Sequence, residues 1–216
     1  MFWSRPTVSD DMREWISDCF DWFDTTFTPI DTPIVPTKAF FKAPGGTDVD
    51  TAALVLEDIK RHLNYNRDIH IQPLDVLSAE YRHNYQAVGE TAGTFQQIDG
   101  VQIIHYDPEQ MHRPLGFINL LAHEVMHARL AGMENDIPGG EDAHELATDL
   151  GCIISGFGVF QLQAADDAGW FGYMTQQSRA HALALFLDRR SLDADTVTPY
   201  LSPRCKKLLL RAIKDL

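Results

Sequence analysis

Hydrophobic residues recur at helical spacing in several stretches of the chain. After Ser9 and Asp10, apolar side chains return every three or four positions as far as Phe23, which predicts an amphipathic helix with a polar cap at its start. The same spacing predicts further helices over about residues 48–63, 115–131, 142–158 and 175–190, and from residue 202 to the C-terminus. Most of the expected regular structure is therefore helical.

Strand patterns are confined to one short part of the chain. Residues 69–72 (IHIQ) alternate between apolar and polar side chains, and residues 94–98 and 101–106 are rich in β-forming types. Asp99-Gly100 separates the last two runs, and glycine accepts the positive φ angle that a tight turn needs, so we expect a β-hairpin there. The prediction is an α+β protein with a small antiparallel sheet.

The stretch from residue 28 to 46 carries four prolines and few helix-forming patterns. It is expected to run extended over the surface, as a wrap or a linker, with Phe40 and Phe41 as anchors. We expect one domain over residues 1–216, made of an N-terminal helix and wrap (1–47), a core (48–158) and a C-terminal helical part (159–216). The content of 44% hydrophobic and 23% charged residues is typical of folded globular domains.

The charge balance excludes some partners. With 18 basic and 31 acidic residues the formal net charge is −13, which repels phosphate backbones and anionic lipid surfaces, so neither nucleic acid nor a membrane is an expected partner. The first residues contain no basic segment followed by an apolar run, and we expect a cytoplasmic protein. Cys19, Cys152 and Cys205 lie far apart and are expected to be ordinary thiols.

The helix predicted over 115–131 contains the sequence HEVMH. His123 and His127 are four positions apart, so on a helix both imidazoles leave one face and can reach the same ion. Glu124 stands beside that face, where a carboxylate can accept a proton from zinc-activated water. The neighbouring positions are mostly uncharged, so a buried helix with this polar stripe calls for a compensating ion, expected to be Zn²⁺.

A zinc ion that acts on a substrate usually has three protein ligands, and Glu145 in HELATDLG is the best candidate for the third. The Gly- and Pro-containing loop before it is long enough to turn the chain back. The rival ligands in the same acidic stretch are His144, Glu141 and Asp142. Asp149, four residues after Glu145, is expected to accept a hydrogen bond from a ligand histidine.

The two motifs together, HEVMH and Glu145-Leu-Ala-Thr-Asp149, resemble the gluzincin zinc metallopeptidases over roughly residues 115–158. The resemblance implies a zincin-like fold, in which an edge strand before the active-site helix pairs with an extended substrate; residues 101–106 would be that strand. PTKAFF at 36–41 and GYMTQQSRAHALALF at 172–186 are similar to segments of bacterial zincin-like proteins, a similarity that adds no known substrate.

No motif identifies the group that stabilises the oxyanion after water attack. Tyr173 and His181 are our candidates, and Arg179 and Tyr200 are also available downstream. The remaining histidines are expected to be surface or packing residues, although His105 ends the proposed edge strand. A cluster of Tyr81, His83 and Tyr85 could line a substrate groove, but such spacing is more often found in a core.

The sequence therefore predicts a zinc-dependent hydrolase that cleaves peptide or amide bonds, with a peptide or protein as substrate. The alternative is a zincin-like scaffold or regulator that acts by binding a protein partner, since fold does not fix function. The intact Glu124 argues against the scaffold, because a purely structural metal site needs no general base and is usually closed by a fourth protein ligand.

Overall fold

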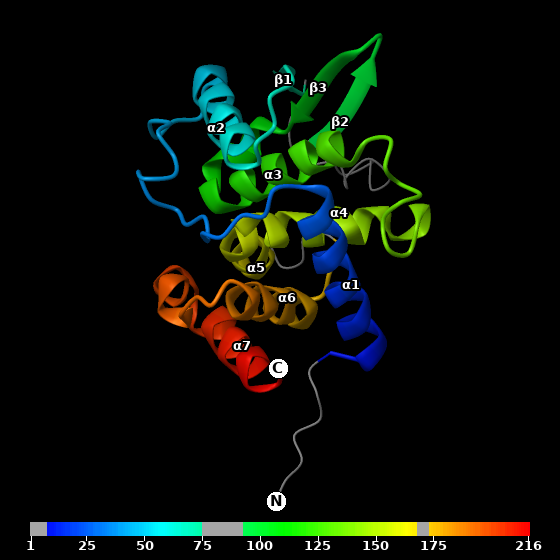
Figure 1. Ribbon diagram of the computed structural model, residues 1–216. Coiled ribbons are helices and arrows are strands. Elements are labelled where there is room, and N and C mark those ends of the chain that lie inside the picture. Colours follow the sequence, from blue (N-terminus) through cyan, green and yellow to red (C-terminus); the bar gives the residue numbers. More distant parts are fainter. Residues whose placement is uncertain (1–7, 75–92, 168–172) are drawn as a thin grey trace, which may run out of the picture. The chain divides into compact units, whose positions relative to one another are not determined.

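The computed structural model describes residues 8–74, 93–167 and 173–216 (Figure 1). The predicted cluster of Tyr81, His83 and Tyr85 lies outside these residues. The chain divides into two compact units, a first unit made of residues 1–36 and 130–216 and a second unit made of residues 37–129. The predicted single domain, with parts bounded at residues 48 and 159, stays a prediction.

The second unit combines a small sheet with two longer helices. Its elements in chain order are α2 (Val49–His62), β1 (Ile69–Pro73), β2 (Gly93–Ile98), β3 (Val101–Tyr106), the short 3-10 helix η2 (Pro108–His112) and α3 (Pro114–Leu130, whose last residue belongs to the first unit). Asp48 caps α2 by accepting a hydrogen bond from the Thr51 amide at 2.8 Å. The predicted α+β class is therefore confirmed, with few strands and many helices.

The three strands form one sheet in the order β1-β3-β2. The hairpin of β2 and β3 is antiparallel, and its turn has Asp99 and Gly100 at positive φ, as predicted. Two predictions were wrong. The sheet is mixed rather than antiparallel, because β1 pairs with β3 in parallel, and residues 101–106 form the central strand rather than an edge.

The error has a local cause. A two-residue turn specifies the partner of β2, whereas β1 is separated from the hairpin by a long connection that carries no register signal. β1 is therefore free to join the other edge of β3, where Ile69 pairs with Gln102. Both edges of β3 are hydrogen-bonded, so β3 cannot pair with a further strand.

The long apolar helix α3 packs within the second unit against the end of the sheet. The rings of Tyr106 in β3 and Phe117 in α3 lie 5.3 Å apart, and the Tyr65 hydroxyl oxygen lies 3.4 Å from the Ala128 carbonyl oxygen. The same hydroxyl donates to buried Gln102 at 2.6 Å. These contacts fix both ends of α3, which carries the predicted zinc ligands His123 and His127.

In its described residues, the first unit has helices as its only regular secondary structure. Its elements are α1 (Asp10–Thr26), η3 (Glu141–Ala143), α4 (His144–Cys152), η4 (Ile153–Phe157), α5 (Gly158–Asp167), α6 (Gln176–Arg189), η5 (Ala194–Thr196), η6 (Thr198–Tyr200) and α7 (Pro203–Lys214). α6 packs against α5, α7 and α1, and α1 also packs against α4 (Figure 1). Its core is formed by large side chains that are almost fully buried: Ile16, Phe20, Phe157, Phe160 and Phe186.

The single helix predicted over residues 142–158 is wrong in detail. The chain instead forms η3, α4, a π-helical turn η4 and then α5, which continues to Asp167. The break lies at Ser155 and Gly156, and Gly156 has φ +92°, a conformation that side chains with a Cβ atom rarely adopt. The Gly156 carbonyl accepts a hydrogen bond from Ile34 at 2.9 Å, so the extended 28–36 segment packs on this break.

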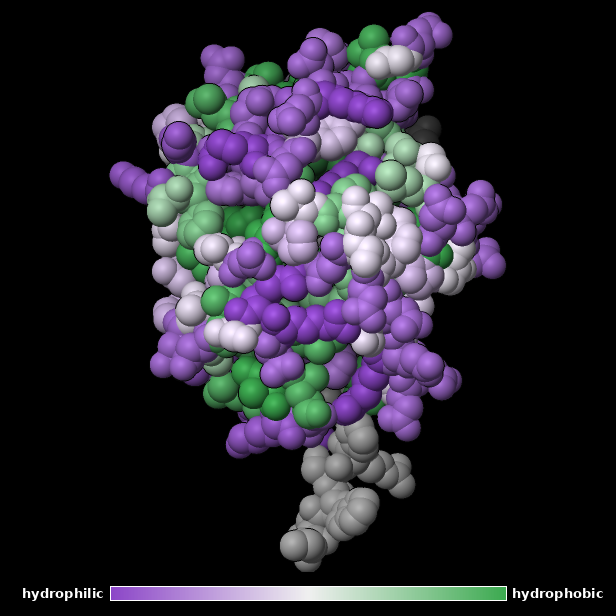
Figure 2. Space-filling view, viewed as in Figure 1, coloured by the Kyte–Doolittle hydropathy of each residue, from purple (hydrophilic) through white to green (hydrophobic). Residues whose placement is uncertain are grey.

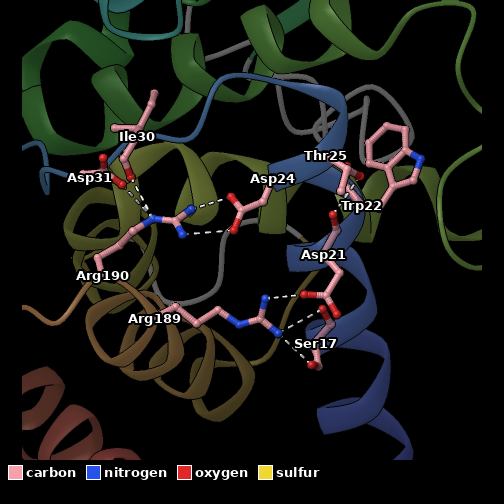
Figure 3. Close-up of polar contacts among 9 residues, drawn as sticks. All are labelled: Ser17, Asp21, Trp22, Asp24, Thr25, Ile30, Asp31, Arg189 and Arg190. Carbon is pink, nitrogen blue, oxygen red and sulfur yellow. Dashed lines mark hydrogen bonds and ion pairs between the residues drawn. The ribbon is translucent and has the colours of Figure 1, made fainter.

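Arginine side chains join α6 to α1 and to the segment that follows it (Figure 3). Arg189 donates to Asp21 at 2.5 Å and to the Ser17 hydroxyl at 2.8 Å. Arg190 forms a two-pronged ion pair with Asp24, and its Nε donates to the Ile30 carbonyl at 3.1 Å. Residues 28–36 form no regular secondary structure, and this segment is held by polar contacts as well as by packing.

Hydrophilic side chains cover much of the face drawn in Figure 2, with hydrophobic surface over α7 (Figure 2). Leu210 and Leu216 are among the exposed hydrophobic residues. In the part of the chain that the structure describes, every helix is too short or too polar to cross a membrane. The three cysteines are buried thiols, and burial raises the pKa of Cys19 to about 12.

Candidate metal centre

The two histidines of HEVMH project from one face of α3 and meet. Their Nε2 atoms lie 3.0 Å apart, and the rings are nearly perpendicular with centroids 4.6 Å apart. Two imidazole nitrogens bound to one tetrahedral zinc at 2.0–2.1 Å would lie about 3.3 Å apart. The observed separation is close to this value, so small movements of His123 and His127 would let both nitrogens bind the same ion.

The same helix buries two further polar side chains near these histidines. Glu124 is only 5% exposed, although a carboxylate is costly to remove from water unless it is compensated. Asn119 lies one turn before His123, is 3% exposed, and its Oδ1 has no hydrogen-bond partner among the described residues. α3 therefore buries Asn119 and Glu124, while His123 and His127 are partly exposed.

Glu145 lies in the first turn of α4, in the other unit, and is partly exposed. Of its rivals as a third ligand, Glu141 and Asp142 are exposed in η3, and His144 is the residue next to Glu145. Partial exposure suits a metal-binding carboxylate better than full exposure, because the carboxylate loses part of its hydration when it binds the ion but must still be reachable by it.

Asp149 follows Glu145 by one helical turn and is 1% exposed. Its Oδ2 accepts hydrogen bonds from the backbone amides of Tyr173 at 2.7 Å and Met174 at 3.2 Å, and from the Arg179 guanidinium at 3.0 Å. That Asp149 also binds a ligand histidine stays a prediction. The observed contacts of Asp149 hold the start of α6 against α4.

The sequence reasoning missed the structural role of Arg179. Its side chain is 1% exposed and forms a salt bridge with Asp149 at 3.0 Å, so both charges are buried together. A signal was present in the sequence: Arg179 precedes buried Leu183 and Phe186 at helical spacing, which places a charged residue on the apolar stripe of its helix. Such a residue is expected to have a buried partner.

The two candidates for oxyanion stabilisation differ in exposure. Tyr173 is 57% exposed while its backbone amide is bound by Asp149, so its phenol stands on a fixed backbone in solvent. His181 is 3% exposed, and its Nδ1 has no hydrogen-bond partner among the described residues. Burial lowers the pKa of His181, the nearby Arg13 lowers it further, and Asp215 partly opposes both effects.

These surroundings place His181 in the core of the first unit, where it has little access to a substrate. Tyr200, in η6, is partly exposed. His105 pairs with Gln72 and Thr94 on either side of it in the sheet. Of the oxyanion candidates, Tyr173 is the most exposed and Tyr200 is partly exposed, whereas His181 and Arg179 are buried.

Comparison with known proteins gives this chain no relative. No protein-family model matches it, and neither a curated protein nor a solved structure is significantly similar to it. Its function is therefore inferred from its own residues.

Proposed function

We propose that the protein is a zinc-dependent hydrolase, of the zincin-like type that the sequence resembles, which cleaves peptide or amide bonds. One observation carries the proposal: two histidine nitrogens converge to 3.0 Å on a helix that also buries the adjacent Glu124. Glu124 is buried beside two partly exposed histidines whose ring nitrogens meet, an arrangement that suits metal-activated water chemistry.

The ligands we propose are His123, His127 and Glu145. Two imidazole nitrogens and one carboxylate oxygen make a group that could hold a metal ion, and this donor set suits zinc, which binds nitrogen and oxygen ligands and leaves a fourth position open. Zinc bound by these residues would acidify a water molecule and polarise a carbonyl group.

The roles of the other residues follow from their positions. Glu124, adjacent to His123 and buried, would accept the proton of the attacking water and pass it to the leaving amine. Its burial keeps bulk water from competing for that proton. The phenol of Tyr173, exposed on a fixed backbone, would donate a hydrogen bond to the substrate oxygen that gains negative charge.

The test compares wild type with Glu124→Gln on a broad peptide library, with cleavage products read by mass spectrometry. Glutamine keeps the size of the side chain but cannot accept the proton, so we expect cleavage to fall about 10²- to 10⁴-fold with zinc content unchanged. Glu109→Gln, an exposed residue of the same unit, is the matched control and should cleave like wild type. Equal cleavage by wild type and Glu124→Gln would contradict the proposal, and zinc binding with no cleavage at all would favour a scaffold.

A further inference from the structure

The buried ion pair of Asp149 and Arg179 stands beside the proposed ligand helix. Both side chains are 1% exposed and their charged atoms are 3.0 Å apart. Removing two charges from water is costly, and well-packed apolar residues of similar size often stabilise a fold as well or better. A buried pair of this kind therefore points to a task other than stability.

The pair fixes one short segment from two sides. Asp149 Oδ2 accepts the amides of Tyr173 and Met174 as well as the Arg179 guanidinium. The next residue, Thr175, is the N-cap of α6 and accepts the Ser178 amide at 3.1 Å. The backbone from Tyr173 to Thr175 thus has defined partners on α4 and on α6.

The segment from Tyr173 to Thr175 is bound to α4 close to the proposed ligand Glu145. Asp149 lies four residues after Glu145, which is about 6 Å along a helix that rises 1.5 Å per residue. The Tyr173 amide donates to Asp149, one helical turn from the proposed zinc ligand Glu145. The tyrosine side chain is long enough to span that turn. Although its backbone is fixed, the Tyr173 side chain remains 57% exposed.

We propose that Arg179 is a positioning residue: acting through Asp149, it fixes the backbone of Tyr173 so that the phenol faces the substrate beside Glu145. The inference rests on the proposed function for its consequence in hydrolysis. Its structural part, that Arg179 and Asp149 together hold the Tyr173 segment, stands on the contacts within the first unit alone. The two parts are tested separately.

The structural part is tested by amide hydrogen exchange on the metal-free protein. In Arg179→Met the carboxylate loses its buried counter-charge, and we expect the Tyr173 and Met174 amides to exchange at least about tenfold faster than in wild type, because their closed state is weakened. Arg179→Lys keeps the charge but loses the planar fork, so intermediate exchange is expected. This variant also serves if Arg179→Met fails to fold.

The matched control is Arg190→Met, at the end of the same helix. This substitution removes the guanidinium that pairs with Asp24 on α1. Like Arg179→Met it breaks an ion pair of the first unit, but that pair does not include Asp149. Exchange at Tyr173 and Met174 should stay within about twofold of wild type in this control. Unchanged exchange in both Arg179 variants, or equal acceleration in the control, would overturn the inference.

The functional part is a double-mutant cycle of Arg179→Lys and Tyr173→Phe on the best library peptide. Each single variant should lower kcat about tenfold to a hundredfold with unchanged zinc affinity, and the double variant should lose no more than the worse single one. Additive losses would refute the coupling. A different outcome would be faster amide exchange in the Arg179 variants but no hydrolysis by wild type. This result would refute the proposed function, while the inference that Arg179 and Asp149 hold the Tyr173 segment would stand.

Discussion

Gly156 offers a quantitative test of how the first unit is assembled. Its φ of +92° lies in the left-handed region, and a Cβ atom added there would lie 3.0 Å from the Thr32 carbonyl oxygen and 3.3 Å from the Ile34 side chain. Gly156→Ala therefore introduces both backbone strain and a clash with the extended segment that packs on the π-helical turn.

The matched control is Gly132→Ala in the same unit, where φ is +85° and a Cβ atom would have nothing within 4 Å. Left-handed strain costs about 1–2 kcal/mol for a residue with a Cβ atom, and part of it is offset because alanine loses less freedom on folding. We expect Gly132→Ala to lower the free energy of unfolding by about 1 kcal/mol. Gly156→Ala should add the overpacking cost of about 1–3 kcal/mol.

The assay is equilibrium unfolding in urea, followed by circular dichroism at equal protein concentration. We predict that Gly156→Ala is less stable than wild type by about 2–4 kcal/mol and clearly less stable than Gly132→Ala. Indistinguishable stabilities of the two variants, or a Gly156→Ala protein as stable as wild type, would refute the packing of residues 32–34 on the helix break.

Two further outcomes follow from the contacts of the first unit. Since the pKa of buried His181 is lowered below 6.5, the unfolded state binds the proton more readily, and wild type should lose stability as the pH falls through that value. With chelator present, the free energy of unfolding of His181→Asn should fall less steeply between pH 7 and 5 than that of wild type. Equal slopes for the two proteins would contradict this prediction. Ser202 caps α7 through the Cys205 amide and donates to Asp166 at 2.8 Å, so Ser202→Ala should cost about 0.5–2 kcal/mol in urea unfolding; a change within error would show that the cap is replaced by water.

Local sequence signals predicted the elements whose causes are local. Apolar repeats at helical spacing located α1, α2, α3, α6 and α7, and Asp99-Gly100 located the hairpin. The four-residue spacing of His123 and His127 was enough to predict that their rings meet, because both positions belong to one helix.

What the sequence could not predict depends on distant partners. β1 joined β3 in parallel, and no turn between them could have specified that register. The break at Gly156 depends on its hydrogen bond to Ile34, more than a hundred residues earlier in the chain. Arg179 was noted only as a possible oxyanion group, because its partner Asp149 lies on a different helix and is thirty residues away.

The central claim is that one zinc ion is held by His123, His127 and Glu145. The most direct measurement is zinc affinity by competition with a chromophoric chelator, for wild type, Glu145→Ala and a control, Glu141→Ala, which removes an exposed neighbour. We predict one equivalent of tightly bound zinc in wild type and in the control, and at least a tenfold weaker affinity in Glu145→Ala, since a ligand is lost. Absence of tight zinc binding in wild type, or equal affinity in wild type and Glu145→Ala, would contradict the account.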